Sequence, residues 1–297
     1  MKLENAIGWT DATTNAVTGC DKVSPGCKNC YAEAGTRARV LRSQGRETWG
    51  AKGERVPVNF EPVFRRLNKL CVCDKCHEAW PHSLLMYEVG GESFCPTCDG
   101  FLRRIRLFAD SNSDFLDRKW KIETLARYLD AIRLAPNVDV QLLTKRIENF
   151  YDRMESVLVS TTGDLQAWVQ KWMDVQQAPN HVWLGVSVED QKRADERRKA
   201  FKDVPAAVKF VSYEPSLERV NWEGWDFVNQ IIAGGESGKN RRPCEVEWWV
   251  STAEFCEANH IPFYMKQDSG LLPGQQGRIP DELWERKEFP KRGGSWS

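Results

Sequence analysis

Residues 105–144 read IRLFADSNSDFLDRKWKIETLARYLDAIRLAPNVDVQLLT, and this stretch decides the fold class. An apolar, β-rich run at 105–110 is followed by a polar turn, then by an amphipathic stretch at 117–135, then by a second β-rich run at 138–144. The middle stretch has apolar residues at roughly helical spacing, so the order is strand, helix, strand. A helix between two strands is typical of a parallel sheet.

The same alternation continues along the chain. Further β-rich runs lie at 181–189, 207–215, 227–236 and 261–267, and helix-like stretches lie at 146–158, 191–203 and 245–259. With residues 6–10 as a first strand, the chain has about seven strands. This pattern favours a complete or partial (β/α) barrel of parallel strands over an open doubly wound sheet.

Composition limits the class of protein. The 297 residues carry 42 basic and 42 acidic side chains with 41% apolar content, which is typical of one large globular domain or two smaller ones. We expect no membrane span, because no window approaches eighteen apolar residues, and a cytoplasmic location, because the start MKLENAIGWT lacks a signal-peptide pattern. Ten cysteines in such a protein then indicate metal sites, not disulfides.

Polar residues are concentrated where the predicted strands end. These ends read DSNSD (110–114), TKR (144–146), SVED (187–190), SYEP (212–215), GGESG (234–238) and KQDSG (266–270). Any one of them could be only a helix N-cap. Because barrels of this kind collect their chemistry at the carboxyl ends of the strands, the ends together predict a site.

Three cysteines lie in one segment, residues 18–33, which read TGCDKVSPGCKNCYAE and are called the cysteine loop below. Cys20, Cys27 and Cys30 with no fourth cysteine nearby match the needs of a [4Fe-4S] cluster with one open iron. Such a cluster can bind S-adenosylmethionine (SAM) and reduce it to a carbon radical. The alternative is a zinc site with a fourth ligand, although no histidine lies close in sequence.

Seven ordered motifs then resemble those of a known family. They are WTDATTNAVTGCDKVSPGCKNCYAE, LFADSNSDF, LLTKR, VWLGVSVED, VKFVSYEP, IIAGGESG with RRP, and PFYMKQ. In this order they resemble a phage and prophage family of radical-SAM-like proteins, known by two phage gene-product numbers and often encoded beside a three-Cys-motif partner protein. The resemblance implies a barrel of radical SAM type that binds a [4Fe-4S] cluster, cleaves SAM to a 5'-deoxyadenosyl radical, and needs an electron donor of flavodoxin or ferredoxin type.

The cysteine spacing departs from the usual radical SAM loop. The common pattern is CxxxCxxC with an aromatic residue before the last cysteine, whereas this chain has CxxxxxxCxxC with Asn29 in that place. The longer first spacing, with Pro25 and Gly26, has to loop out to bring Cys20 to the cluster. Tyr31 is the candidate to replace the missing aromatic near the adenine.

The resemblance also implies roles for residues at the strand ends. Ser111, Asn112 and Ser113 are expected to receive the methionine amino group, and Lys145 or Arg146 to pair with the methionine carboxylate. Ser187 and Glu189 are expected near the adenosine. The substrate would then face Glu214, Glu236 and Lys266. Cys244 could return a hydrogen atom to a substrate radical, or could be a small buried apolar residue.

A second cysteine pattern interrupts the alternation at residues 68–103, called the cysteine ribbon below. Cys73 and Cys76, then Cys95 and Cys98, form two CxxC pairs with the spacing of a structural zinc site, and a second iron-sulfur cluster is the alternative. Cys71 is left over and could replace Cys73. We therefore expect a zinc ribbon at 68–103 inserted into a barrel made of 1–67 and 104–297. It would serve as a docking module or as a structural staple.

Two functional classes remain open. The first is a radical SAM enzyme that acts on a nucleic-acid base or nucleotide, since a zinc ribbon and arginine clusters at 103–106 and 239–242 are compatible with nucleic acid. The zero net charge gives no overall electrostatic signature of such binding. The second class is a non-catalytic nucleic-acid or partner-binding protein whose cysteines hold structural zinc.

Overall fold

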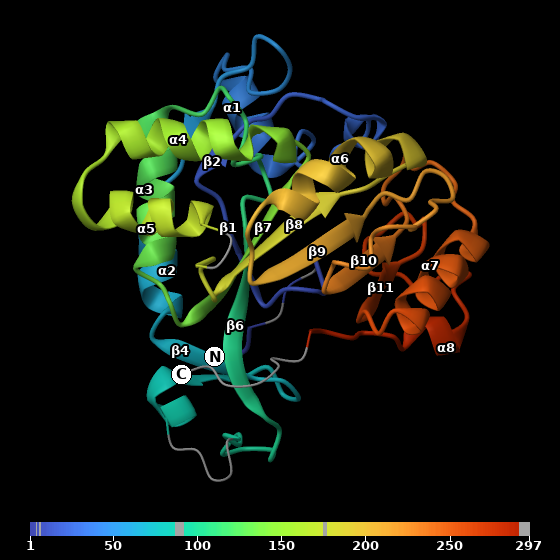
Figure 1. Cartoon of the computed structure of the whole chain (residues 1–297). Coiled ribbons are helices and arrows are strands. Elements are labelled where there is room, and N and C mark those ends of the chain that lie inside the picture. Colours follow the sequence, from blue (N-terminus) through green and yellow to red (C-terminus); the bar gives the residue numbers. More distant parts are fainter. Residues whose placement is uncertain (4, 6, 87–91, 175–176, 291–297) are drawn as a thin grey trace.

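The computed structural model describes residues 1–3, 5, 7–86, 92–174 and 177–290. In these residues one nine-stranded sheet forms the centre of the molecule, and seven of its strands run parallel (Figure 1). In spatial order they are β1 (Ala12–Thr14), β6 (Leu102–Ala109), β7 (Val138–Thr144), β8 (Val182–Ser187), β9 (Val208–Tyr213), β10 (Gln230–Gly234) and β11 (Phe263–Gln267). The prediction of an α/β chain with a mostly parallel central sheet is confirmed.

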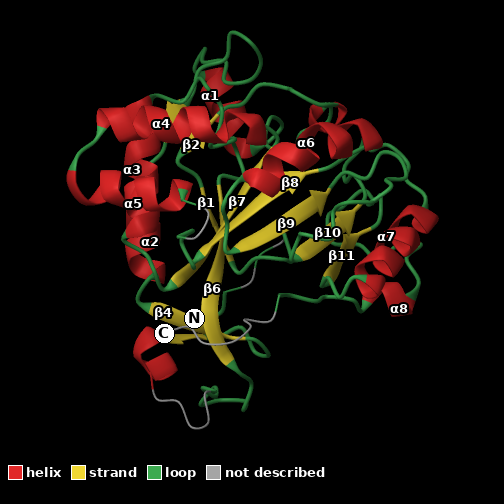
Figure 2. Cartoon of the chain, in the orientation of Figure 1, coloured by secondary structure: helices red, strands yellow, loops and turns green. Residues whose placement is uncertain are grey.

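Helices lie in the connections between the successive parallel strands from β6 to β11, except in the connection from β9 to β10 (Figure 2). The α-helices of the described residues are α1 (Thr36–Ser43), α2 (Glu61–Leu67), α3 (Ile122–Arg133), α4 (Phe150–Ser160), α5 (Gly163–Met173), α6 (Gln191–Asp203), α7 (Val246–Ala258) and α8 (Asp281–Trp284). In α3, Leu125, Leu129 and Ile132 are spaced by four and three residues and all are buried, so one face packs on the core. None of the described helices has the length and apolar character that crossing a bilayer requires.

The parallel strands bury both of their faces. Every second residue of a strand, such as Leu107 of β6 and Val140 of β7, packs with the helices in the main core. The residues between them point to the other face, where Trp9, Phe108 and Phe210 belong to a smaller apolar cluster. The strands therefore carry apolar side chains on both faces, as strands buried in the middle of a protein do.

The sheet is strongly curved toward the smaller cluster. Five strand spacings separate β6 from β11, which is about 24 Å in a flat sheet. Yet Arg106 of β6 lies 3.4 Å from the ring centre of Phe289, and that ring lies 5.4 Å from the ring of Tyr264 on β11. The two strands therefore face each other across a short distance. In the described residues β1 and β11 do not pair, so hydrogen bonding does not close the sheet.

The first strand lies later in the chain than predicted. Of the expected strand at 6–10, Ala6 lies outside the described residues, 7–9 form a turn and bends, and residue 10 is irregular. The strand is Ala12–Thr14, paired with β6. The reason is packing: Trp9 is only 2% exposed, with its ring 4.7 Å from that of Phe108 and 5.9 Å from that of Phe210. The apolar residues of this segment fill the concave face of the sheet.

The cysteine ribbon is continuous with the central sheet. Its strands β4 (Leu70–Cys73) and β5 (Ala79–Pro81) are antiparallel, and β4 pairs with the first three residues of β6. The last five residues of β6 pair with β7, so one strand belongs to both parts. Figure 1 shows β4 at the end of β6 opposite to α1, which follows the cysteine loop. A small two-stranded sheet, β2 (Val17–Thr18) with β3 (Val56–Pro57), flanks that loop.

Candidate functional site

A cavity of about 1010 Å³ lies at the carboxyl ends of the parallel strands, and the cysteine loop forms part of its wall. The structure brings most of the predicted site residues to it. Those that line it are Cys20, Cys27, Cys30, Tyr31, Ser111, Asn112, Ser113, Lys145, Arg146, Ser187, Glu214, Glu236 and Lys266. Residues from six strand ends and the cysteine loop therefore surround one space.

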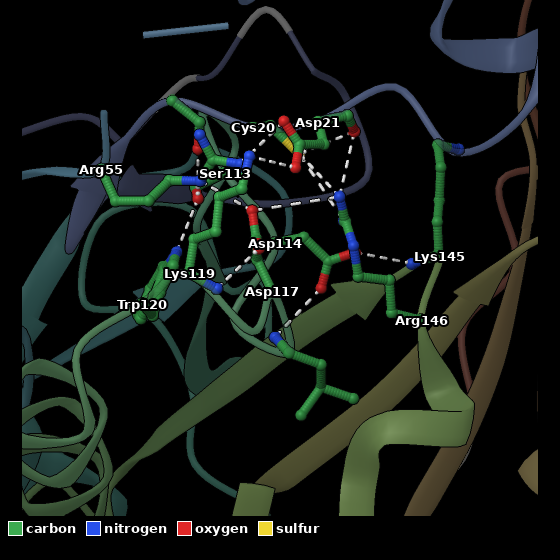
Figure 3. Close-up of polar contacts among 12 residues, drawn as sticks. Cys20, Asp21, Arg55, Ser113, Asp114, Asp117, Lys119, Trp120, Lys145 and Arg146 are labelled. Carbon is green, nitrogen blue, oxygen red and sulfur yellow. Dashed lines mark hydrogen bonds and ion pairs between the residues drawn. The ribbon is translucent and has the colours of Figure 1, made fainter. Parts of the chain in front are cut away.

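Cys20 lies against the side chain of Arg146 (Figure 3). Both terminal nitrogens of Arg146 lie 3.6 Å from Cys20 Sγ, and one of them also donates to the backbone oxygen of Asp21 at 3.0 Å. The other donates to Asp114 Oδ2 at 2.9 Å. Burial raises the pKa of the Cys20 thiol to about 12, and the nearby Arg146 guanidinium opposes this rise.

Further charged groups surround this contact. Asp21 pairs with Lys119 at 2.7 Å and with Arg55 at 3.2 Å, and Arg55 also pairs with Asp117 at 2.7 Å. With Asp114 and Arg146 these residues form a group that we call the Cys20 ion-pair network. Its members are Asp21, Arg55, Asp114, Asp117, Lys119 and Arg146. These groups come from the cysteine loop, the segment after α1, and the loops that follow β6 and β7.

Glu189, just after β8, supports the second part of the cysteine loop. Its carboxylate accepts from Ser24 Oγ at 2.8 Å, Lys145 Nζ at 2.5 Å and Arg197 Nη1 at 2.8 Å. Burial acts to raise the pKa of Glu189, but Lys145 and Arg197 overcome this and lower it to about 2. Glu189 is 0% exposed and does not line the cavity, so its position is that of a support for the loop.

Glu236, just after β10, contacts the same loop. It accepts from the amide of Asn29 at 2.9 Å and pairs with Arg242 at 2.6 Å, while Arg242 also donates to the backbone oxygen of Pro25 at 2.9 Å. Burial opposes ionisation, but Arg242 and Asn29 lower the pKa of Glu236 below its usual range. Asn29 therefore joins the cysteine loop to the carboxyl end of β10.

The segment after β6 also contacts the cysteine loop. Ser113 Oγ donates to the backbone oxygen of Gly19 at 2.8 Å and accepts from Trp120 Nε1 at 2.8 Å. Gly19 N donates to the backbone oxygen of Asn112, and Tyr31 donates its hydroxyl to the backbone oxygen of Ser111 at 3.2 Å. Tyr31 is 61% exposed, so much of its ring stays accessible at the cavity wall.

An ion pair forms another part of the cavity wall. Lys266, on β11, lies 2.8 Å from Glu214, which follows β9, and Ser212 donates to the same carboxylate at 3.4 Å. The two charged side chains are 19% and 12% exposed. Trp9 and Phe108 line the same cavity and supply apolar surface. Besides the cysteines, the cavity wall therefore contains one acid, one base and aromatic rings.

Cys244 is not brought to the cavity. It is buried, its Sγ lies 3.8 Å from Arg278 Nη2 and 4.0 Å from Asp268 Oδ1, and burial raises the pKa of its thiol to about 11. It is not among the residues that line the cavity, and its surroundings are those of a small packed residue. The geometry gives no support to its predicted hydrogen-atom role.

The second cysteine group is compact. Sulfur atoms of Cys73 and Cys98 lie 3.5 Å apart, those of Cys76 and Cys95 lie 3.7 Å apart, and all four lie within 4.8 Å of one another. Four sulfurs around one zinc ion, with bonds near 2.3 Å, are about 3.8 Å apart. This group could therefore bind a metal. Cys71 lies outside this group, and its Sγ lies 3.4 Å from the backbone oxygen of Pro81. Of the two candidates, Cys73 and not Cys71 therefore belongs to the group of four cysteines.

Sequence reasoning missed several residues that hold the cysteine loop or its supports in place. Asp114 ends the predicted polar segment 110–114, but its sequence position indicated no role. In the structure it joins the loop after β6 to the end of β7 through Thr144 and Arg146. Arg55 and Arg197 had no signal at all. Their contacts join segments far apart in the chain, and no spacing rule reports such pairs.

The family described as "Protein of unknown function (DUF5131)" matches residues 4–287. No curated protein and no solved structure matches the chain. Because the family match spans nearly the whole chain, the protein belongs to that family.

Proposed function

We propose that this protein is a radical SAM enzyme built on an open (β/α) barrel. The carrying observation is that Cys20, Cys27 and Cys30 line one cavity together with the carboxyl ends of the parallel strands. That is where the chemistry of βα-built folds collects.

The residues fit a [4Fe-4S] cluster better than a single zinc ion. The described residues that line the cavity include three cysteines but neither a fourth cysteine nor a histidine. The three sulfurs also do not form a compact group of the kind found in the cysteine ribbon, as far as the described residues go. A cluster whose corner irons each take one thiolate requires wider spacing and leaves one iron open.

When bound, such a cluster supplies the electron that cleaves SAM to a 5'-deoxyadenosyl radical. The chain's own residues would bind and orient the reactants. Lys145 lines the cavity and pairs with Glu189, whereas the terminal nitrogens of Arg146 already contact Cys20, Asp21 and Asp114. Lys145 is therefore the stronger candidate for the methionine carboxylate. Ser111 and Asn112 are the candidates for the amino group, since Ser113 already uses its hydroxyl on both sides.

The substrate would occupy the side of the cavity lined by Glu214 and Lys266. Trp9 and Phe108 offer apolar ring surface there, and an acid and a base can both hydrogen-bond to a polar ring. These features support a nucleic-acid base or nucleotide as substrate. The volume of about 1010 Å³ is at the upper end for small-molecule sites, so SAM and part of a substrate fit together.

The cysteine ribbon is proposed to bind zinc as a structural ion. Its sulfur spacings match tetrahedral coordination, and backbone amides of Lys75 and Cys76 donate to Cys73 Sγ at 3.4 Å each. The ribbon lies at the far end of β6 from the cavity, about 25 Å away along an eight-residue strand. This separation favours a structural role over delivery of substrate.

Metal analysis of anaerobically purified protein tests the function. We expect about four irons and about one zinc per chain, a brown colour, and 5'-deoxyadenosine after dithionite and SAM are added. Cys27→Ala should lose the iron, and Cys256→Ala, which changes a buried cysteine of α7, should keep it. Zinc alone, with no iron accepted on reconstitution, would reject the proposal in favour of a non-catalytic binding protein.

A further inference from the structure

We propose that Arg146 is the positioning residue for Cys20, and that its N–H contacts to the sulfur raise the reduction potential of the cluster. The inference rests on the proposed function, because it concerns a cluster bound by Cys20. It assigns Arg146 a role different from the pairing with methionine carboxylate that its place after β7 suggests.

The first support is the geometry of the guanidinium. Both terminal nitrogens of Arg146 lie 3.6 Å from Cys20 Sγ, and the residue is 6% exposed. Two further contacts fix the plane of the group: Asp114 Oδ2 at 2.9 Å and the backbone oxygen of Asp21 at 3.0 Å. A planar guanidinium fixed at two points has little freedom to turn away from the sulfur. It is also left with few donors for a substrate.

The second support is that the partners of Arg146 are themselves fixed. Asp114 accepts from Thr144 Oγ1 at 2.7 Å and from the backbone amide of Lys145 at 2.9 Å, which joins it to the end of β7. On the other side, Asp21 pairs with Arg55 and Lys119. The Cys20 ion-pair network therefore fixes the side chain of Arg146 and the backbone beside Cys20.

The third support is the cysteine spacing. Six residues separate Cys20 from Cys27, whereas Cys27 and Cys30 are joined by a short turn. The turn fixes the relative position of the last two cysteines, but it cannot fix Cys20. Cys27 has a contact from its own loop, Ser24 Oγ at 3.6 Å. Backbone hydrogen bonds with Thr48 and Gly50 hold the main chain at Cys20, and the Cys20 ion-pair network holds the guanidinium of Arg146 against its sulfur.

The consequence for the cluster follows from charge. Reduction adds an electron, so N–H donors and a positive charge beside a ligand sulfur stabilise the reduced state more than the oxidised state. Charge-assisted hydrogen bonds are stronger than neutral ones, so the effect of a guanidinium is larger than that of an amide. Loss of Arg146 should therefore lower the midpoint potential of the cluster.

A redox titration followed by electron paramagnetic resonance tests this, with iron content measured on the same samples. The variants are Arg146→Gln, which removes the charge, and Arg146→Lys, which keeps the charge but loses the planar fork. The matched control is Arg106→Gln, because Arg106 is also buried and pairs with an aspartate, Asp11 at 3.7 Å, that is not part of the Cys20 ion-pair network. We expect a negative shift for both Arg146 variants, larger for Gln, and none for the control.

Each other outcome has a defined meaning. If wild-type protein accepts no iron, the proposed function fails before the inference is reached. If Arg146→Gln folds with the thermal midpoint of the control but loses iron that the control keeps, the positioning role is supported and Arg146→Lys reports the potential. If both Arg146 variants keep their iron and match the control in potential, the inference is overturned. Equal loss of iron in the control overturns it as well.

Discussion

A Cβ atom on residue 26 would stand 2.5 Å from Cγ of Glu189, so the cysteine loop passes this carboxylate at a distance that only glycine permits. Glu189 itself cannot easily retreat, because it is fully buried and bonded to Arg197. The relationship between Gly26 and Glu189 therefore sets how deep the loop lies against the end of β8.

Gly26→Ala should push the cysteine loop away from Glu189. We expect a loss of about 1–3 kcal/mol in the free energy of unfolding, the usual cost of overpacking, and reduced iron uptake on reconstitution. Urea unfolding and iron analysis would measure the two effects. Lys28→Ala, an exposed change in the same loop, serves as control and should alter neither. Equal stability and iron content in the two variants would show that this contact does not position the loop.

Glu189→Gln should destabilise the fold by about 3–5 kcal/mol at neutral pH, because Lys145 and Arg197 lose a buried carboxylate. The pKa of Glu189 is lowered to about 2, below the ordinary 4.5, so its stabilising contribution is present above pH 4.5 and is lost as the pH falls toward 2. The gap between wild type and variant in urea unfolding should therefore shrink in acid. Glu196→Gln, on the exposed face of α6, should cost less than about 1 kcal/mol.

Asp110→Asn should make the protein more stable at pH 8 than wild type. Burial raises the pKa of Asp110 to about 7 from 3.8, against the opposing backbone amides of Ala16 and Val17. A raised pKa means that the carboxyl favours folding below pH 4 and that this contribution is lost as the pH rises through 7. The difference should reach roughly 3–4 kcal/mol at pH 8 and vanish near pH 4.

Chemical denaturation between pH 4 and 8 would measure the Asp110 effect. Asp152→Asn, a change at an exposed carboxylate of α4, should leave the pH dependence unchanged. If the Asp110→Asn variant followed the same pH curve as wild type, Asp110 would not be the group responsible.

Cys95→Ser should remove the metal of the cysteine ribbon, whereas Cys71→Ser should keep it. Both residues are buried, but only Cys95 belongs to the group of four sulfurs within 4.8 Å. Metal analysis of the purified variants would show a loss of about one ion per chain for Cys95→Ser alone. Loss of the ion from Cys71→Ser, or its retention in Cys95→Ser, would contradict this assignment of the ligands.

The sequence could predict the strands and their common edge because both follow from short-range patterns. β-rich runs such as 138–144 alternate with stretches whose apolar residues have helical spacing. Because parallel strands place their polar ends at one edge of the sheet, Lys145, Glu214 and Glu236 were predicted at the same site as the cysteines. The compact group of four cysteines in the ribbon likewise follows from two CxxC turns. Local spacing carries this information.

The remainder depends on contacts between distant segments. Trp9 belongs to an apolar run typical of a strand, yet its ring fills the concave face against Phe210. Glu189 was predicted near the adenosine. In the structure its two carboxylate oxygens accept hydrogen bonds from Ser24 and Arg197, and it does not line the cavity. Ion pairs of this kind depend on which charges the fold brings together, and periodicity does not encode that.

The pairing of the N-terminal segment has a consequence for the order of folding during synthesis. Met1 and Leu3 hydrogen-bond to the backbone of the cysteine ribbon at Ala79 and His77, and β1 pairs with β6. Met1, Leu3 and β1 therefore wait for these partners until the ribbon and β6 have left the ribosome, whereas β2 can pair earlier with β3.

The contacts of the cysteine loop are completed later still during synthesis. Its contacts with Arg146, Glu189 and Arg242 require successively later strands, and the last of these closes a loop of more than two hundred residues, from Pro25 to Arg242. We therefore expect the three thiols to stay accessible through most of translation. Under the proposed function, insertion of a cluster would come before the wall of the cavity is complete.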